Sequence, residues 1–130
     1  MKIKKAPPYP FVLDALESAE PYTRPMFGCT AIYVGEKIVL ILRDRESSPE
    51  DNGVWLATTK ENHESLKRDF PSMRSIYLFA EGGPTGWQVL PSNADDFEEA
   101  AILACEMILK KDPRIGNIPK TKKPRAKKRK

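Results

Sequence analysis

The stretch TAIYVGEKIVLIL, residues 30–42, decides the fold class, because it predicts a β-hairpin. β-Branched and aromatic side chains, which favour strands, lie on both sides of Gly35-Glu36. Glycine at the first position of a two-residue loop is typical of a type II′ turn. Residues 38–42 are apolar on both alternations, which predicts a central strand that is covered on both faces.

Outward from this hairpin, the pattern alternates between short helices and further strands. Helical spacing of apolar residues predicts a first helix over residues 11–19, and the same spacing of His63, Leu66 and Phe70 predicts a second. Strands are expected at residues 30–34, 37–42, 54–58, 75–79 and 87–90. The residues between 42 and 54 are polar and predict a solvated loop.

A longer helix is expected near the end of the folded part. Asn93 is predicted to cap it, with Asp95 and Asp96 in its first turn and Lys110 and Lys111 in its last. Its buried stripe is expected to comprise Phe97, Ala101, Ala104, Cys105 and Ile108. The order α-β(3)-α-β(2)-α predicts an α+β fold, in which helices cover an antiparallel sheet.

Three segments follow from this pattern and from the chain's length of 130 residues. Residues 1–10 contain three prolines and predict an extended lead-in. Residues 11–112 are expected to form a single α+β domain. Residues 113–130 are expected to be a linker and a disordered basic tail.

The last eleven residues concentrate positive charge. They hold eight of the chain's 22 Lys and Arg residues and no Asp or Glu, so the remaining 14 basic residues face 18 acidic ones. The eight are Lys120, Lys122, Lys123, Arg125, Lys127, Lys128, Arg129 and Lys130. Such a run predicts nonspecific attachment to the phosphates of nucleic acid, with a merely solubilising terminus as the alternative.

Residues that could carry catalysis are few. Cys29 and Cys105 have no CxxC or Cys/His spacing, so we expect buried reduced thiols and no structural metal. His63, the single histidine, is expected to pack on a helix face. The clusters Glu50-Asp51, Asp95-Asp96 and Glu98-Glu99 are interpreted as solvated or helix-start carboxylates. We therefore predict no enzyme activity, no catalytic residue and no cofactor.

The remaining motifs favour structural roles. Glycines in residues 82–86 precede a strand and lack a following Lys-Ser/Thr, which favours a hairpin connection over a phosphate-binding loop. Five strand aromatics are expected mainly in the core, with base stacking as the alternative: Tyr33, Trp55, Tyr77, Phe79 and Trp87. No signal peptide or membrane-spanning stretch is evident, so a cytoplasmic location is expected.

The run RPMFG, comprising Arg24, Pro25, Met26, Phe27 and Gly28, resembles a family motif. An Arg-x-Met-Phe-Gly run that opens a β-hairpin is similar to the N-terminal domain of the TfoX/Sxy family, over about residues 11–110. The family often shows a second glycine where this chain has Cys29. The resemblance implies a secretion-chaperone-like α-β(3)-α-β(2)-α fold and supplies no catalytic residues.

Full-length TfoX-type proteins resemble regulators of competence genes that act with a transcription factor. They pair this domain with a helical second domain, in whose place this sequence has the basic tail, so the competence role is not carried over to this chain. The resemblance implies a regulatory or adaptor domain. We expect Arg24 to pair with a carboxylate and Phe27 to lie in the core, and a binding surface around the motif is the alternative. The expected partners are nucleic acid at the tail and a protein at the folded body, with homodimerisation as another option.

A competing hypothesis belongs to a different class. It is a small enzyme or ligand-binding protein, with a pocket between sheet and helix near Arg24, Cys29 and Trp87.

Overall fold

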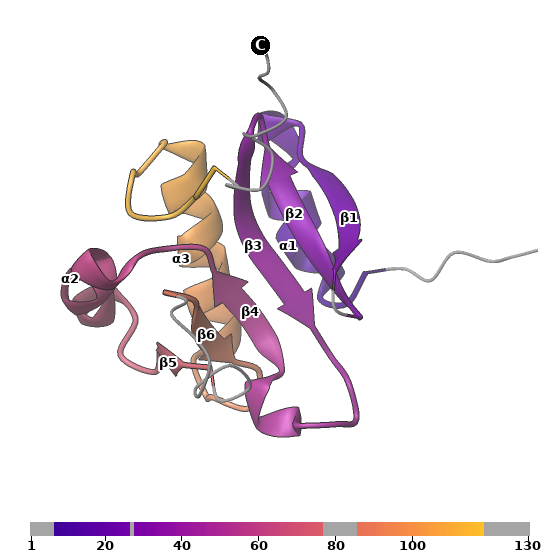
Figure 1. Ribbon diagram of the computed structural model, residues 1–130, viewed down its shortest axis with the longest axis vertical. Coiled ribbons are helices and arrows are strands. Elements are labelled where there is room, and N and C mark those ends of the chain that lie inside the picture. The colour runs from indigo at the N-terminus through magenta and orange to yellow at the C-terminus, as the bar shows by residue number, and fades with distance from the viewer. Residues whose placement is uncertain (1–6, 27, 77–85, 119–130) are drawn as a thin grey trace, which may run out of the picture.

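A computed structural model describes residues 7–26, 28–76 and 86–118. These residues form an antiparallel six-stranded sheet with the strand order β1-β2-β3-β4-β6-β5 (Figure 1). The strands are β1 (Tyr22–Met26), β2 (Cys29–Val34), β3 (Lys37–Arg43), β4 (Gly53–Leu56), β5 (Arg74–Ser75) and β6 (Gln88–Pro91). The helices are α1 (Pro10–Ala15), α2 (His63–Asp69) and α3 (Phe97–Leu109), with 3-10 turns at Glu17–Ala19, Pro49–Asp51 and Lys60–Asn62. The α+β class and the antiparallel sheet are thus confirmed.

The hairpin of β2 and β3 follows the predicted geometry. Val34 pairs with Lys37, so Gly35 and Glu36 form the two-residue loop. Gly35 has φ 62° whereas Glu36 does not have a positive φ, which is the sign pattern of a type II′ turn. Every residue of β3 after Lys37 is buried, as expected for a central strand.

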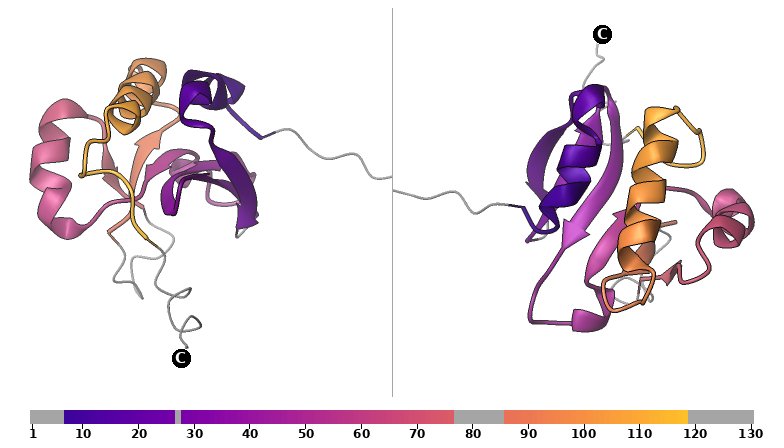
Figure 2. Two further views of the ribbon diagram at one scale, coloured as in Figure 1. Left: turned by 90° about the horizontal axis from the view of Figure 1, so that it is seen from above. Right: turned by 180° about the vertical axis from the view of Figure 1, so that it is seen from behind.

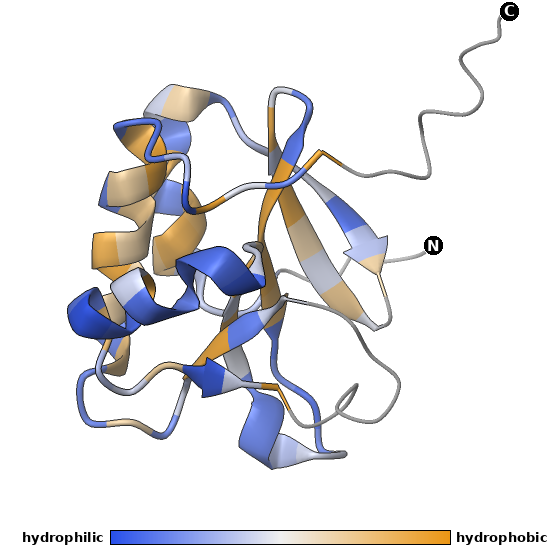
Figure 3. Ribbon diagram, turned by 60° about the vertical axis from the view of Figure 1, so that its left-hand side comes forward, coloured by the Kyte–Doolittle hydropathy of each residue, from blue (hydrophilic) through white to orange (hydrophobic). Residues whose placement is uncertain are grey.

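Helices α1 and α3 lie side by side on one face of the sheet, whereas α2 lies at its margin (Figure 2). The predicted stripe of α3 is buried, and it packs with Val12 and Leu16 of α1 against strand residues such as Leu40. A second apolar cluster on the other face includes Ile41 and Trp55. Figure 3 shows the contrast between hydrophobic central strands and the mainly hydrophilic α2.

Strand β1 is absent from the sequence-based prediction, so four described strands precede α2 instead of three. Pro21 precedes this strand, Pro25 lies within it, and four of its five side chains are exposed. An edge strand without a buried face has no apolar alternation, and proline is tolerated on such an edge. The pairing of β1 with β2, from Tyr22–Tyr33 to Met26–Cys29, therefore becomes visible only in three dimensions.

The start of α3 differs from the prediction. Asp96 is the N-cap residue, so Asn93 and Asp95 lie before the helix, and Glu98 and Glu99 are its first-turn carboxylates. The reason is a turn after β6, in which the amide of Ala94 donates to the carbonyl of Pro91. At the other end, Lys110 is the C-cap and Lys111 lies beyond it.

Several predictions fall outside the described residues. These are most of the strand over residues 75–79, the connection over residues 82–86 apart from Gly86, Phe27 and the basic tail. Within the described ranges, no helix is long and apolar enough to cross a membrane.

Candidate functional site

The RPMFG motif occupies the end of edge strand β1 and the turn that follows it. Arg24, Pro25 and Met26 belong to β1, and Phe27 lies outside the described residues. The guanidinium carbon of Arg24 lies 6.0 Å from the centre of the Tyr33 ring, which is a cation–π arrangement. Arg24 makes no ion pair with a described carboxylate, so its expected carboxylate pairing is not seen among these residues.

The backbone conformation at Gly28 favours glycine. Its φ of 77° is left-handed, and a Cβ there would overlap the guanidinium of Arg45. An Nη of Arg45 donates to the Gly28 carbonyl at 3.2 Å. The turn between β1 and β2 is therefore held by the loop that follows β3.

A pocket of about 720 Å³ opens beside this motif. Its walls include Arg24 and Cys29 from the motif region, Leu42 and Asp44 from the end of β3, and Pro8 from the segment before α1. Two of the three residues that we expected at a ligand pocket, Arg24 and Cys29, thus lie together.

The two cysteines are both buried, as predicted. Burial raises the pKa of the Cys29 thiol, although the nearby Arg43 and Arg45 oppose that rise. Burial raises the pKa of Cys105 to about 12. A protonated thiol is a weak nucleophile, so neither environment favours thiolate chemistry near neutral pH.

The third residue expected at the pocket, Trp87, lies elsewhere. Its ring centre is 6.2 Å from that of Trp55, which is 1% exposed, on the face opposite α1 and α3. Burial of Trp55 and Tyr33 confirms their expected core role.

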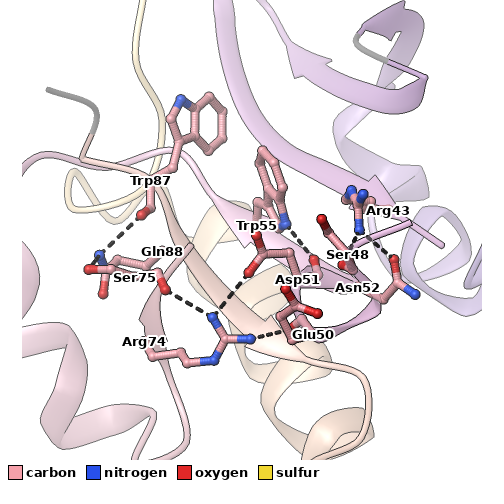
Figure 4. Close-up of polar contacts among 10 residues, drawn as sticks. All are labelled: Arg43, Ser48, Glu50, Asp51, Asn52, Trp55, Arg74, Ser75, Trp87 and Gln88. Atoms are coloured by element: carbon pink, nitrogen blue, oxygen red, sulfur yellow. Dashed lines mark hydrogen bonds and ion pairs between the residues drawn. The ribbon is translucent and has the colours of Figure 1, made fainter. Parts of the chain in front are cut away.

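Sequence reasoning missed a buried polar network next to the pocket (Figure 4). The side chain of Arg43 is 3% exposed and closes the loop between β3 and β4. Its guanidinium donates to the carbonyls of Ser47 and Ser48, both at 2.8 Å, and to Oδ1 of Asn52 at 2.9 Å. Neutral oxygens thus accept hydrogen bonds from both terminal nitrogens of this buried cation.

The network continues to a buried carboxylate. Asp51 is fully buried and pairs with Arg74 at 3.1 Å, and Arg74 also donates to the carbonyl of Glu50. The indole N–H of Trp55 donates to the Asp51 carbonyl at 2.9 Å. The prediction that the Glu50-Asp51 pair lies in a solvated loop is therefore wrong for Asp51. Its pairing with Arg74 spans 23 residues, and no local pattern marks it.

His63 begins α2 and faces the chain before β6. Its Nε2 lies 2.8 Å from the carbonyl oxygen of Gly86, so the half-buried ring forms a hydrogen bond to a segment 23 residues away in the sequence. Within the part of the chain that the structure describes, no cluster of three or more His, Cys, Asp or Glu residues is placed to bind a metal ion.

The described chain ends beside the β2–β3 hairpin. Asn117 forms a bridge with Ile38 of β3, and Ile118 is the last described residue. All eight candidate nucleic-acid-binding residues, from Lys120 to Lys130, lie beyond it.

Comparison with known proteins finds no relative of this chain. No family model matches the chain, and neither a curated protein nor a solved structure matches it.

Proposed function

We propose that this protein is a non-enzymatic regulatory or adaptor domain that attaches nonspecifically to nucleic acid through residues 120–130. The observation that carries the proposal is the separation of charge along the chain. Eight cations and no acid occupy the tail, while the rest of the chain has 18 acidic and 14 basic residues. Polyanions attract such a tail by releasing counterions, whereas the acidic body is repelled from phosphate.

The resemblance of residues 24–28 to the TfoX N-terminal motif supports the regulatory part of the proposal. The proposal assigns contact with a protein partner in the cytoplasm to the folded body of this chain. Edge strand β1 suits that contact, because its side chains from Tyr22 to Pro25 are exposed and no described strand pairs with its outer edge. Open strand edges offer backbone groups that another chain can pair with.

The role of the tail is tested by measuring how strongly three forms of the protein are retained on heparin and on duplex DNA at low salt. They are the intact chain, a chain without residues 120–130, and a chain in which the eight tail cations are replaced by glutamine. We expect both altered proteins to lose retention while the melting temperature stays nearly unchanged. Retention of the shortened protein would show that a surface of the body binds nucleic acid.

The partner is tested by affinity capture from cell extract after nuclease treatment. Arg24→Glu changes the exposed β1 surface, and Arg68→Glu on exposed α2 is the matched control. We expect a captured protein that survives nuclease and tail removal and that Arg24→Glu alone abolishes. Loss of every captured protein on nuclease treatment would contradict the adaptor role.

A ligand-binding or enzymatic role is the second candidate, and the pocket that joins Arg24 to Cys29 favours it. The raised pKa of Cys29 speaks against a nucleophilic cysteine. The variant Cys29→Ala separates the two candidates. If the protein is an adaptor, the variant still captures its partner from cell extract. If the protein is a cysteine-dependent enzyme, the variant loses the cellular effect.

A further inference from the structure

A second pocket lies at the opposite end of β3 from the RPMFG motif. It has a volume of about 360 Å³ and forms where the β2–β3 hairpin, the end of α3 and residues 115–118 meet. Its aliphatic lining includes Val34, Val39, Ile108 and Ile115. Small-molecule sites typically have volumes of about 300–1,000 Å³ and an apolar lining with a few polar groups. This pocket therefore suits a short apolar ligand.

The walls of this pocket are held by backbone hydrogen bonds. The amide of Ile38 donates to the carbonyl of Asn117 at 2.9 Å, and the amide of Asn117 donates to the carbonyl of Ile38 at 3.0 Å. The amide of Gly116 donates to the carbonyl of Ala57 at 2.7 Å. Since these bonds anchor the C-terminal segment along β3, the pocket is largely formed before a ligand arrives.

Two lysines and two carboxylates also line this pocket. Asp112 is already engaged, because an Nη of Arg114 lies 2.8 Å from its Oδ2 and hydrogen bonds from Arg114 lower the pKa of Asp112. Lys37 and Lys111 make no ion pair with any described residue, which leaves only Glu36 against them. The lining thus has an excess of available positive charge.

Lys111 is the residue at which the chain turns away from α3. Its φ of 64° is left-handed, a conformation that glycine or asparagine usually occupies after a helix. The amides of Lys111 and Asp112 donate to the carbonyls of Ile108 and Met107, so this conformation ends the helix, and Lys111 lies in the lining of the pocket.

We propose that this pocket binds a small amphipathic carboxylate, whose aliphatic chain lies on the aliphatic side chains of the lining and whose carboxylate lies between Lys37 and Lys111. This ligand adds to the proposed adaptor function and does not depend on the tail. Charge complementarity selects the anion, and the apolar lining selects the hydrocarbon chain.

Calorimetric titration of the full-length protein with octanoate tests the proposal, with octanol and acetate as matched probes. We expect octanoate to bind saturably at one site. Octanol, which lacks the charge, should bind about tenfold more weakly, and acetate, which lacks the chain, should not bind. Absence of saturable octanoate binding would overturn the proposal, and so would equal affinity for octanol. Binding of several octanoates would assign them to the tail cations and equally overturn it.

Variants of three exposed lysines test whether octanoate binds in this pocket. The double variant Lys37→Met/Lys111→Met should weaken octanoate about tenfold and leave octanol unchanged. Lys110→Met is the control, because Lys110 adjoins Lys111 but does not line the pocket. Equal weakening by Lys110→Met, or unchanged octanoate binding in the double variant, would refute the site. Retention on DNA, measured on the same variants, should not change, so a failure here is distinct from a failure of the tail proposal.

Discussion

Arg43 stands where the aliphatic strand β3 meets the polar loop that leads to β4. The carbonyls of Ser47 and Ser48 and the amide oxygen of Asn52 accept hydrogen bonds from its guanidinium. Asn52 in turn bonds the backbone of Arg45, whose own guanidinium lies on Gly28. One buried arginine thus fixes the loop that supports the RPMFG turn.

Replacing Arg43 with methionine should lower the free energy of unfolding by about 2–3 kcal/mol, because the buried oxygen acceptors lose their donors. Urea denaturation measures the change. Arg68→Met on exposed α2 is the matched control and should change stability by less than about 0.5 kcal/mol. A similar small effect for both variants would mean that water replaces the Arg43 guanidinium.

Strand β4 depends on a close approach between two backbones. Gly53 begins β4 and pairs with Pro91 of β6, and a Cβ at Gly53 would overlap the carbonyl oxygen of Leu90 and crowd the amide of Ser92. Its φ of 142° also disfavours any other residue. Because these obstacles are backbone atoms, no side-chain movement relieves them.

Gly53→Ala should therefore disrupt the β4–β6 pairing and lower the free energy of unfolding by more than about 3 kcal/mol. Gly35→Ala is the control, since Gly35 also has a positive φ but nothing lies within 4 Å of its Cβ position. We expect that control to cost only about 1 kcal/mol. Thermal and urea unfolding compare the two, and equal losses would show that conformational strain alone matters.

On the scale of the whole molecule, the described fold is an acidic body and the basic residues of the tail follow its last described segment. The described chain ends at Ile118, next to β3 and the β2–β3 hairpin. Phosphate contacts position a protein without reading sequence, so the tail alone offers affinity and not specificity.

The intact protein should bind duplex DNA with a steep dependence on salt and no preference of sequence. If about six tail cations contact phosphates, affinity should fall about a thousandfold between 50 and 200 mM salt. Fluorescence anisotropy with two unrelated duplexes of equal length measures both properties. A shallow salt dependence, or a clear preference for one duplex, would contradict a tail-only contact.

Some of this protein follows from local sequence. The hairpin over residues 30–42, the buried stripe of α3 and the α+β class were predictable, because side-chain periodicity and turn residues act over short distances. Charge in the tail also requires only counting.

Tertiary structure alone decided the rest. Exposed β1 has no periodic signal, and the Asp51–Arg74 pair joins residues 23 positions apart. The lysine-lined pocket unites residues from the hairpin and the end of α3. Such contacts depend on which faces meet after the chain folds. Local sequence therefore determined the β2–β3 hairpin, the buried stripe of α3 and the charged tail, whereas packing between distant elements decided the edge strand β1, the buried network and both pockets.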